Sequence, residues 1–255
     1  MYRILALVER EYRIKVRSPG FYVIQGAQPV LFLVFFVASI GAKISRGSIG
    51  GQGLPYIEFV APGLIVLQSF YVFPFVGSMV SNERRYGMYR VILTTRARFS
   101  DYLAAKIIVE YSFVLVQATL IVLIAYGLVG PFAGLRILWW GLPILFLSTS
   151  TWVSVGSLFG FAFPQEHYRS AFIGLLSLPL TFASTIFYSL SGTPIWIQAL
   201  ASVNPITYAT DALRSGWFGS TDVLGLGVTA GIAILAVAVS VLVAARSPLL
   251  PKTAR

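Results

Sequence analysis

The sequence predicts an all-α membrane protein with six transmembrane helices, and three observations lead to that prediction. The 255 residues are 57% hydrophobic and only 11% charged, whereas a soluble domain carries about 25% charged residues. Apolar runs of about 20 residues, long enough to cross a hydrocarbon core about 30 Å thick, recur along the chain. Lysines and arginines gather beside some of these runs and are scarce beside others. We therefore expect one transmembrane domain over residues 1–255 and no separate soluble domain.

Residues 1–20 are predicted to form an amphipathic helix at the membrane interface. Its apolar positions recur every three to four residues and its arginines lie opposite them. The apolar positions are Met1, Ile4, Leu5, Val8, Tyr12 and Val16, and the opposite positions are Arg3, Arg10, Arg13 and Arg17. Such a helix is too charged to span, but it suits the headgroup boundary. The apolar run that follows is too long for a cleavable signal, so the first span should remain attached.

Six apolar runs supply the expected spans. They cover residues 21–41, 59–80, 107–129, 138–163, 170–190 and 223–245. A polar inner loop, 82–106, separates the second span from the third, and a short basic tail, 246–255, follows the sixth. Ser100 and Asp101 predict a helix start ahead of the third span, because a serine can cap free amides and an aspartate suits the helix dipole. Lys106 and Glu110 stand four residues apart, so we expect them to pair.

Residues 191–222 are too polar to cross the membrane but contain two short apolar stretches, 195–201 and 206–218. Asn204 and Pro205 lie between the stretches, and asparagine followed by proline is typical of a helix start. We expect two short re-entrant helices that dip into the outer leaflet.

The positive charges indicate the orientation. If both termini are cytoplasmic, fifteen of the 19 lysines and arginines lie on the inner side, and only Lys43, Arg46, Arg136 and Arg214 lie outside. This distribution follows the positive-inside rule. The sequence therefore predicts a multi-pass protein of the plasma membrane with cytoplasmic N- and C-termini.

Nothing in the sequence indicates chemistry on a substrate. The chain has no cysteine and a single histidine, His167, so we expect no disulfide and no metal site. Gly47 to Gly53 is glycine-rich but lacks the lysine of a phosphate-binding loop. The hydroxyl residues between Ser148 and Ser154 have no accompanying base, and we expect them to bond to helix backbones or across to neighbours. We predict that the chain is not an enzyme, holds no cofactor and binds no nucleic acid.

Three groups of residues resemble the permease subunits of type 2 ATP-binding-cassette (ABC) exporters. Glu83-Arg84, Gly87, Leu93 and Lys106 resemble that family's Glu-Arg-Glu-x-Gly-Thr segment, and Tyr56, Phe59 and Pro62-Gly63 resemble its entry to the second span. Asn204-Pro205-Ile206-Thr207-Tyr208, with Arg214, Pro194 and Trp196, resembles its Asn-Pro-x-x-Tyr element, which is the most specific of the three. The chain departs from the family pattern at Arg85, Met88, Arg90 and Arg96, which make the inner loop more basic.

The resemblance implies an exporter that moves a hydrophobic or amphipathic substrate outward, such as a drug-like molecule, a lipid or a lipid-linked glycan. A separate ABC ATPase subunit, carrying ATP and Mg, would supply the energy, and a second copy or a paralogue would complete the pore. The residues that would contact the ATPase are Glu83, Arg84, Arg85, Tyr86, Gly87, Met88, Arg90, Arg10 and Arg13. An outer gate would comprise Asn204, Pro205, Tyr208, Arg214 and Trp196.

Some choices stay open at the level of sequence. Gln68, Tyr71 and Gln117 lie inside spans, where they could line a pathway or bond between helices. Gly156-x-x-x-Gly160 and Gly227-x-x-x-Gly231 permit close helix packing, within one subunit or between two. The alternatives to an ATP-driven exporter are a secondary transporter or channel without an ATPase, and a membrane assembly protein that transports nothing. No span carries a central ionisable residue for ion coupling, which disfavours the first alternative.

Overall fold

A computed structural model describes residues 2–17, 20, 27, 31–32, 34–35, 56–88, 97–129, 136–163 and 165–246. Over these residues the chain forms eight helices and no strand. They are α1 (Tyr2–Val16), α4 (Tyr56–Arg85), α6 (Phe99–Val129), α7 (Arg136–Ala162), α8 (Glu166–Phe182), α9 (Ile195–Ser202), α10 (Pro205–Trp217) and α11 (Val223–Arg246). The expected first span, 21–41, lies largely outside the described residues.

Four of the described helices, α4, α6, α7 and α11, are long and apolar enough to cross a membrane. They correspond to the second, third, fourth and sixth expected spans. Two of them extend beyond the predicted bounds into the polar inner loop. Helix α4 continues to Arg85, and α6 begins at Phe99. A helix of 30 residues is about 45 Å long, so α4 exceeds the hydrocarbon thickness of about 30 Å.

The fifth expected span is helical over only part of its length. We predicted it to reach residue 190, but α8 has 17 residues and ends at Phe182, and residues 183–188 follow as a bent, non-helical segment. The Asn204 amide donates to the carbonyl oxygens of Leu180 and Ala183 at 2.7 and 2.8 Å. A side chain from a distant segment therefore satisfies the last carbonyls of α8, which a continued helix would have bonded itself.

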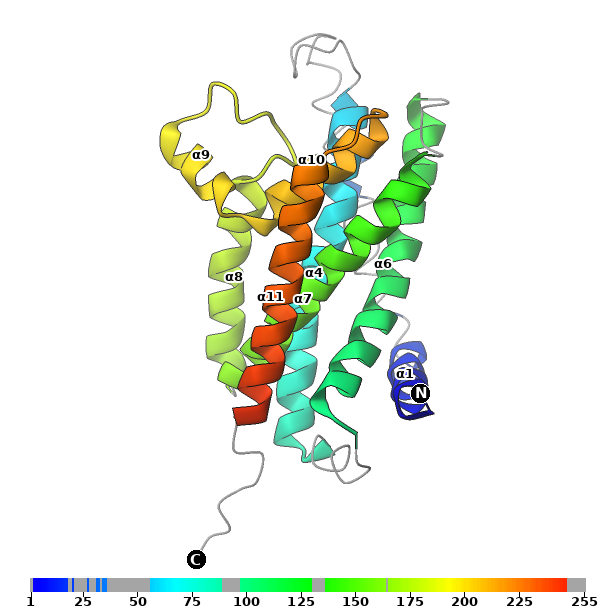
Figure 1. Ribbon diagram of the computed structural model, residues 1–255, viewed down its shortest axis with the longest axis vertical. Coiled ribbons are helices and arrows are strands. Elements are labelled where there is room, and N and C mark those ends of the chain that lie inside the picture. The colour runs from blue at the N-terminus through cyan, green and yellow to red at the C-terminus, as the bar shows by residue number, and fades with distance from the viewer. Residues whose placement is uncertain are drawn as a thin grey trace, which may run out of the picture.

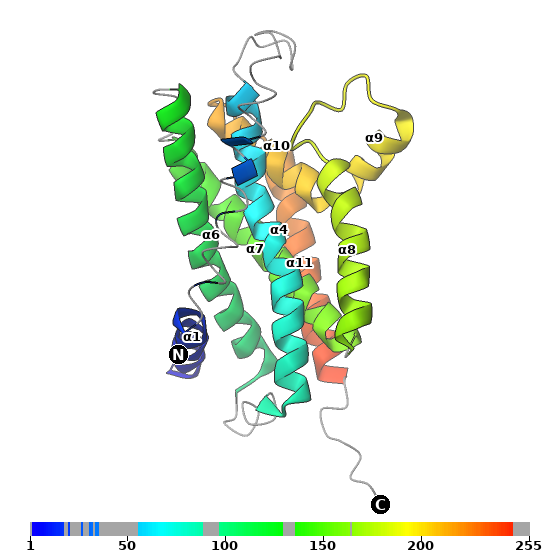
Figure 2. The same ribbon diagram turned by 180° about the vertical axis from the view of Figure 1, so that it is seen from behind.

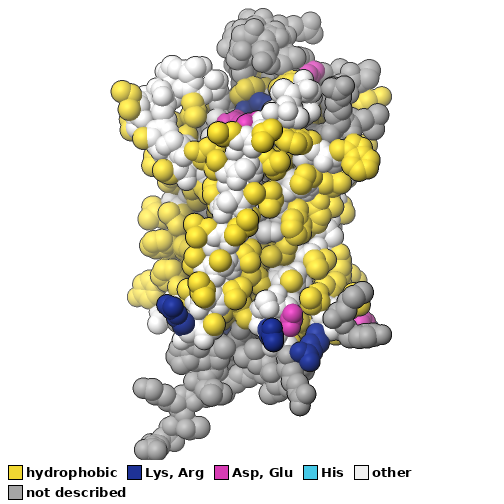
Figure 3. Space-filling model, viewed as in Figure 1, with side chains coloured by type: hydrophobic (Ala, Val, Ile, Leu, Met, Phe, Trp, Pro, Cys, Tyr) yellow, Lys and Arg dark blue, Asp and Glu magenta, His cyan; other side chains and the backbone are white. Residues whose placement is uncertain are grey.

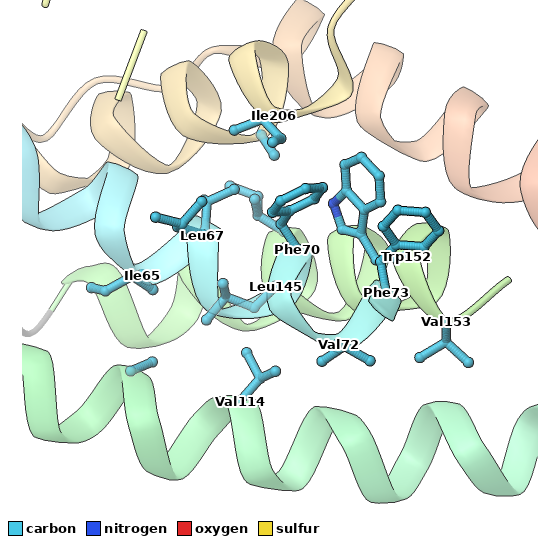
Figure 4. Packing of buried hydrophobic residues seen from close by; sticks show 14 of the residues in the cluster. Ile65, Leu67, Phe70, Val72, Phe73, Val114, Leu145, Trp152, Val153 and Ile206 are labelled. Carbon is cyan, nitrogen blue, oxygen red and sulfur yellow. The ribbon is translucent and has the colours of Figure 1, made fainter. Parts of the chain in front are cut away.

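Helices α4 and α7 form the centre of the bundle, and the other long helices surround them (Figures 1 and 2). Figure 4 shows Phe70 and Phe73 of α4 facing Trp152 of α7, and the rings of Phe70 and Trp152 meet edge to face at 4.7 Å. A Cβ on Gly156 would lie 2.7 Å from the Phe73 carbonyl oxygen. The first glycine motif therefore packs inside this chain, whereas Gly227 has open space around it.

The hydroxyl residues of the fourth span bond as predicted except Thr149, whose buried hydroxyl has no hydrogen-bond partner. Ser150, Ser154 and Ser157 donate to carbonyl oxygens one turn earlier in α7. Ser148 instead shares a hydrogen bond of 2.6 Å with Ser69 of α4. These bonds satisfy polar groups within and between helices that have no water to bond.

The outer surface matches a bilayer environment. On the face shown in Figure 3, hydrophobic side chains cover the middle of the molecule, and Lys, Arg, Asp and Glu side chains lie toward its two ends. Exposed leucines, isoleucines and valines of α6 and α11 contribute to the apolar surface, among them Val116, Leu123, Ile234 and Leu235. A helix that is apolar on its exposed side indicates contact with lipid.

The two ends of the bundle carry different elements. Helix α1 and the C-terminal end of α11 lie at one end, which we call the α1 end, and α9 and α10 lie at the opposite end, which we call the α10 end (Figure 1). The two short helices before the last span are confirmed. Asn204 also begins α10 as predicted, because its side chain accepts from the Ile206 amide and Pro205 occupies the first turn.

Candidate functional site

A buried group of charged side chains joins three helices at the α1 end. We call it the charged cluster. It consists of Arg10, Glu11 and Lys15 from α1, Glu83 from α4, and Tyr102, Lys106 and Glu110 from α6. Each helix contributes at least one ion-pairing side chain, so the cluster ties the amphipathic helix to the ends of the second and third spans.

Glu83 is the hub of the cluster. Its carboxylate accepts from Arg10 at 2.6 Å, lies 3.4 Å from the Lys106 amine and accepts from the Tyr102 hydroxyl. Glu11 is a second bridge, at 2.7 Å from Arg10 and 3.0 Å from Lys106. Two carboxylates therefore share two cations across three helices.

Lys15 and Glu110 form a separate pair in the same cluster. The Lys15 amine donates to Glu110 at 2.7 Å, and it also lies 4.2 Å from the centre of the Phe113 ring. Burial lowers the pKa of Lys15, while Glu110 opposes that shift. For Arg10, burial also acts to lower the pKa, but the Glu83 and Glu11 carboxylates outweigh it and the pKa is raised.

The expected pairing of Lys106 with Glu110 is wrong. Within the described residues, both side chains form their ion pairs with other partners, and Lys106 contacts Glu11 while Glu110 contacts Lys15. Glu11 and Lys15 are four residues apart on α1, as Lys106 and Glu110 are on α6. Two helices with opposite charges at the same spacing can exchange partners when they pack together, and the bonds across the helices then replace those along each helix.

Helix α1 packs against the bundle with a mixed side that includes Leu7 and Val8 as well as Glu11 and Lys15. Glu11 and Lys15 are almost fully buried against the bundle, whereas Leu5 and Val16 of the predicted stripe are exposed. This arrangement leaves apolar side chains for lipid, as an interfacial helix requires.

The residues proposed to contact an ATPase fall into two groups. Glu83 and Arg10 bond to each other inside the charged cluster, and Arg84 donates to the Phe161 carbonyl oxygen at 2.7 Å. Arg85, Tyr86 and Met88 are exposed at the end of α4, where Gly87 adopts a positive φ of 73°. Arg13 is exposed and pairs with Glu9. Arg90 lies outside the described residues.

The residues proposed as an outer gate hold the α10 end together. Arg214 is the main contact. Its guanidinium donates to the carbonyl oxygens of Thr185 at 2.6 Å and Phe59 at 3.2 Å, pairs with Asp211 at 3.0 Å, and lies 3.9 Å from the Phe59 ring. Burial lowers the pKa of Arg214 to about 10, and Asp211 opposes the shift.

The other proposed gate residues differ in how closely they are held. Asn204 caps both α8 and α10, and Tyr208 donates to the Ser202 carbonyl oxygen at 2.5 Å. Pro205 occupies the first turn of α10. Trp196 of α9 is 64% exposed. The bent segment 183–188 is the shared partner of Asn204 and Arg214.

The three candidate pathway residues lie in different environments. Gln68 is buried, with its amide nitrogen bonded to the Leu64 carbonyl oxygen and its amide oxygen without a partner. Tyr71 and Gln117 are partly exposed. Their role in a pathway stays a prediction.

Sequence reasoning missed Glu11, Lys15, Tyr102 and Tyr56 as site residues. The matching Glu-x-x-x-Lys of α1 and Lys-x-x-x-Glu of α6 was a signal that could have found the first two. Tyr56 donates to the Phe187 carbonyl oxygen at 3.0 Å, and no sequence spacing indicates that contact, because the two residues are 131 positions apart.

Comparison with known proteins identifies the class to which this architecture belongs. Residues 2–218 match the ABC-2 type transporter family, and the chain is a member of that family. It is therefore a multi-pass membrane component of a transporter.

Similar proteins are named "Putative transport permease ycf38". The protein of Cyanophora paradoxa is 26% identical over 239 residues, covering 88% of this chain and 78% of the relative. Those of Porphyra purpurea and Pyropia yezoensis are each 28% identical, covering 83% of this chain and 72% of the relative. The resemblance drawn from the motifs is confirmed.

Proposed function

We propose that this chain is the membrane-spanning permease subunit of an ATP-driven exporter. It moves a hydrophobic or amphipathic substrate outward, and a separate ABC ATPase subunit supplies the energy. Membership of the ABC-2 type transporter family supports the transport role. The observation that carries the coupling role is the charged cluster, which joins α1, α4 and α6 where the inner loop begins and ends.

The cluster offers a physical route for coupling. The ends of α4 and α6 flank the inner loop, and Glu83 bonds to α1 and α6 together. Buried ion pairs resist separation, because a single charge left without its partner is costly. A force applied to the loop would therefore move the three helices as a unit and tilt the spans above them.

The ATPase would dock on the exposed residues that end α4. Tyr86 is 75% exposed and Met88 is 47% exposed, and both follow the last helical turn. Exposed aromatic and methionine side chains are common in protein interfaces. The bonds of Glu83 and Arg10 inside the chain support a role for these two residues in transmitting movement and not in touching the partner.

The remaining parts of the proposal concern placement and assembly. The protein lies in the plasma membrane with its α1 end toward the cytoplasm, so both termini are cytoplasmic. The distribution of lysine and arginine favours this orientation. A second copy or a paralogue completes the pore.

Capture of the ATPase tests the proposal. The chain would be co-expressed with candidate ABC ATPase subunits from the same genome and purified through a tag on the permease. Tyr86→Ala combined with Met88→Ala should reduce ATPase recovery by roughly tenfold, since interface residues that matter contribute more than about 1 kcal/mol each.

Tyr126→Ala is the matched control, because Tyr126 is an exposed aromatic residue near the other end of α6. It should leave ATPase recovery unchanged. Equal recovery with the Tyr86/Met88 variant and the wild type would reject this docking surface, and failure of the wild type to capture any ATPase would reject the coupling proposal.

A further inference from the structure

A basic cleft of about 650 Å³ opens at the α1 end, between the last turns of α4 and the start of α8. Its lining residues are Ser81, Arg84, Arg85, Gln165, Glu166 and His167. The cleft is separate from the charged cluster, because none of these six residues belongs to it. The family resemblance assigns Arg84 and Arg85 to ATPase contact, but the docking residues Tyr86 and Met88 do not line the cleft.

Positive charge dominates the surroundings of the cleft. Two arginines line it, against the single carboxylate of Glu166. Arg169, which does not line the cleft itself, stands one helical turn beyond Gln165 and is 1% exposed. Its guanidinium donates to the Ser78 hydroxyl and to the Phe163 carbonyl oxygen, each at 3.3 Å, and its Nε has no hydrogen-bond partner. No ion pair among the described residues includes Arg169. A buried cation that lacks a carboxylate partner gains stability from an anion nearby.

The lining groups suit a phosphate in particular. Guanidinium groups present paired N–H donors that match phosphate oxygens. The side chain of Gln165, which precedes the first residue of α8, makes no capping bond, and the start of a helix also favours negative charge. Ser81 and His167 add polar groups to the same wall.

An apolar stripe leaves the cleft along α8. Tyr168, Phe172, Leu175, Leu178 and Phe182 are 66%, 44%, 71%, 64% and 52% exposed. Successive members are three or four residues apart, so they lie along one side of the helix. A ligand with a phosphate at one end and hydrocarbon chains at the other fits this combination.

We propose that the cleft binds the phosphate of an anionic phospholipid in the leaflet at the α1 end. Arg84 and Arg85 are the phosphate ligands, and the acyl chains lie along the α8 stripe. The inference requires only that the chain spans a membrane, and it does not depend on an ATPase partner.

Lipid binding to the purified full-length chain tests this inference. Native mass spectrometry in detergent would measure retention of phosphatidylglycerol, with phosphatidylcholine as the zwitterionic comparison. Arg85→Gln should weaken phosphatidylglycerol binding by about tenfold, the typical effect of losing one charge-assisted hydrogen bond. Arg85 is the better probe, because Arg84 also bonds to the α7 backbone. Glu166→Gln should strengthen the same binding.

Opposite effects at Arg85 and Glu166 distinguish a phosphate site from a general effect on folding. Arg17→Gln and Arg246→Gln are the matched controls, since both arginines are exposed at helix ends outside the cleft, and they should leave binding unchanged. Equal loss with the controls, or no change with Arg85→Gln, would overturn the site.

Competition with a soluble phosphate compound tests whether the ligand is a lipid. Glycerol phosphate should displace phosphatidylglycerol only weakly, because it lacks the chains that contact α8. Displacement as effective as that by the lipid itself would overturn the lipid assignment in favour of a soluble phosphate. Neither result affects ATPase capture through Tyr86 and Met88, so this inference and the proposed function fail separately.

Discussion

Both ends of the molecule bury cationic side chains, but they pair them with different acceptors. At the α1 end, Arg10, Lys15 and Lys106 meet the carboxylates of Glu11, Glu83 and Glu110 from three helices. At the α10 end, Arg214 and Asn204 donate to main-chain carbonyl oxygens of the segment that follows α8. The charged cluster joins its helices through side chains that face each other, although Arg84 and Arg169 at the same end also donate to the carbonyl oxygens of Phe161 and Phe163. The segment that follows α8 is held by side chains that donate to its backbone.

The difference follows from what each end must satisfy. In the charged cluster, Lys106 and Glu110 lie inside α6, where backbone bonds are made within the helix, so side chains join α6 to α1. Helix α8 stops at Phe182, and its last carbonyls need donors from elsewhere. Both partners of an ion pair can be replaced at once, which leaves no buried charge without a counter-ion. No substitution removes a main-chain carbonyl group, so a lost donor leaves that carbonyl unpaired.

The largest effect is expected at the Lys15–Glu110 pair. Lys15→Met leaves the buried Glu110 carboxylate without its cation and should destabilise the protein by about 3–5 kcal/mol. Adding Glu110→Leu removes the stranded charge, so the double variant should recover most of that loss. Unfolding free energies of both single variants and the double variant in detergent would provide the measurement. A double variant as unstable as the sum of the two singles would contradict the comparison.

A somewhat smaller loss, roughly 2–4 kcal/mol, is expected for Arg214→Ala, because carbonyl groups of the 183–188 segment lose their donor. Adding Asp211→Asn should not recover this loss, because the main-chain acceptors remain once Asp211, the one side-chain acceptor of the guanidinium among the described residues, is neutralised. Arg214→Lys should recover part of it, because one amine cannot reach all the acceptors that the guanidinium does. Thermal unfolding of the wild type, Arg214→Ala, Arg214→Ala with Asp211→Asn, and Arg214→Lys would measure these losses. Full recovery with Asp211→Asn would show that the ion pair, and not the carbonyls, matters.

The sequence predicted the helices better than it predicted their contacts. Apolar runs located α4, α6, α7 and α11, and Asn204 with Pro205 located the start of α10, because both signals are local. The end of α8 could not be predicted, since it depends on Asn204 reaching back from 21 residues away.

The same reasoning explains the partial prediction of the site. Motif resemblance indicated Glu83, Asn204 and Arg214, but not which partners they would have. Glu11 and Lys15 contact residues 95 positions distant, and such pairs form only once the helices have packed. The intrahelical pairing of Lys106 and Glu110 was the best local choice, and tertiary contacts replaced it.

The smallest expected effect tests whether the α10 end depends on close backbone approach as well as on donors. A Cβ on Gly63 would lie 2.9 Å from the Cα of Ile186, so Gly63→Ala should push the 183–188 segment away from α4 and cost about 1–3 kcal/mol. Gly227→Ala in α11 is the matched control, because that glycine has open space around it, and alanine should there stabilise the helix slightly. Unfolding midpoints of the two variants would separate packing from helix propensity. If Gly63→Ala were as stable as Gly227→Ala, the donors of Arg214 and Asn204 alone would hold the segment in place.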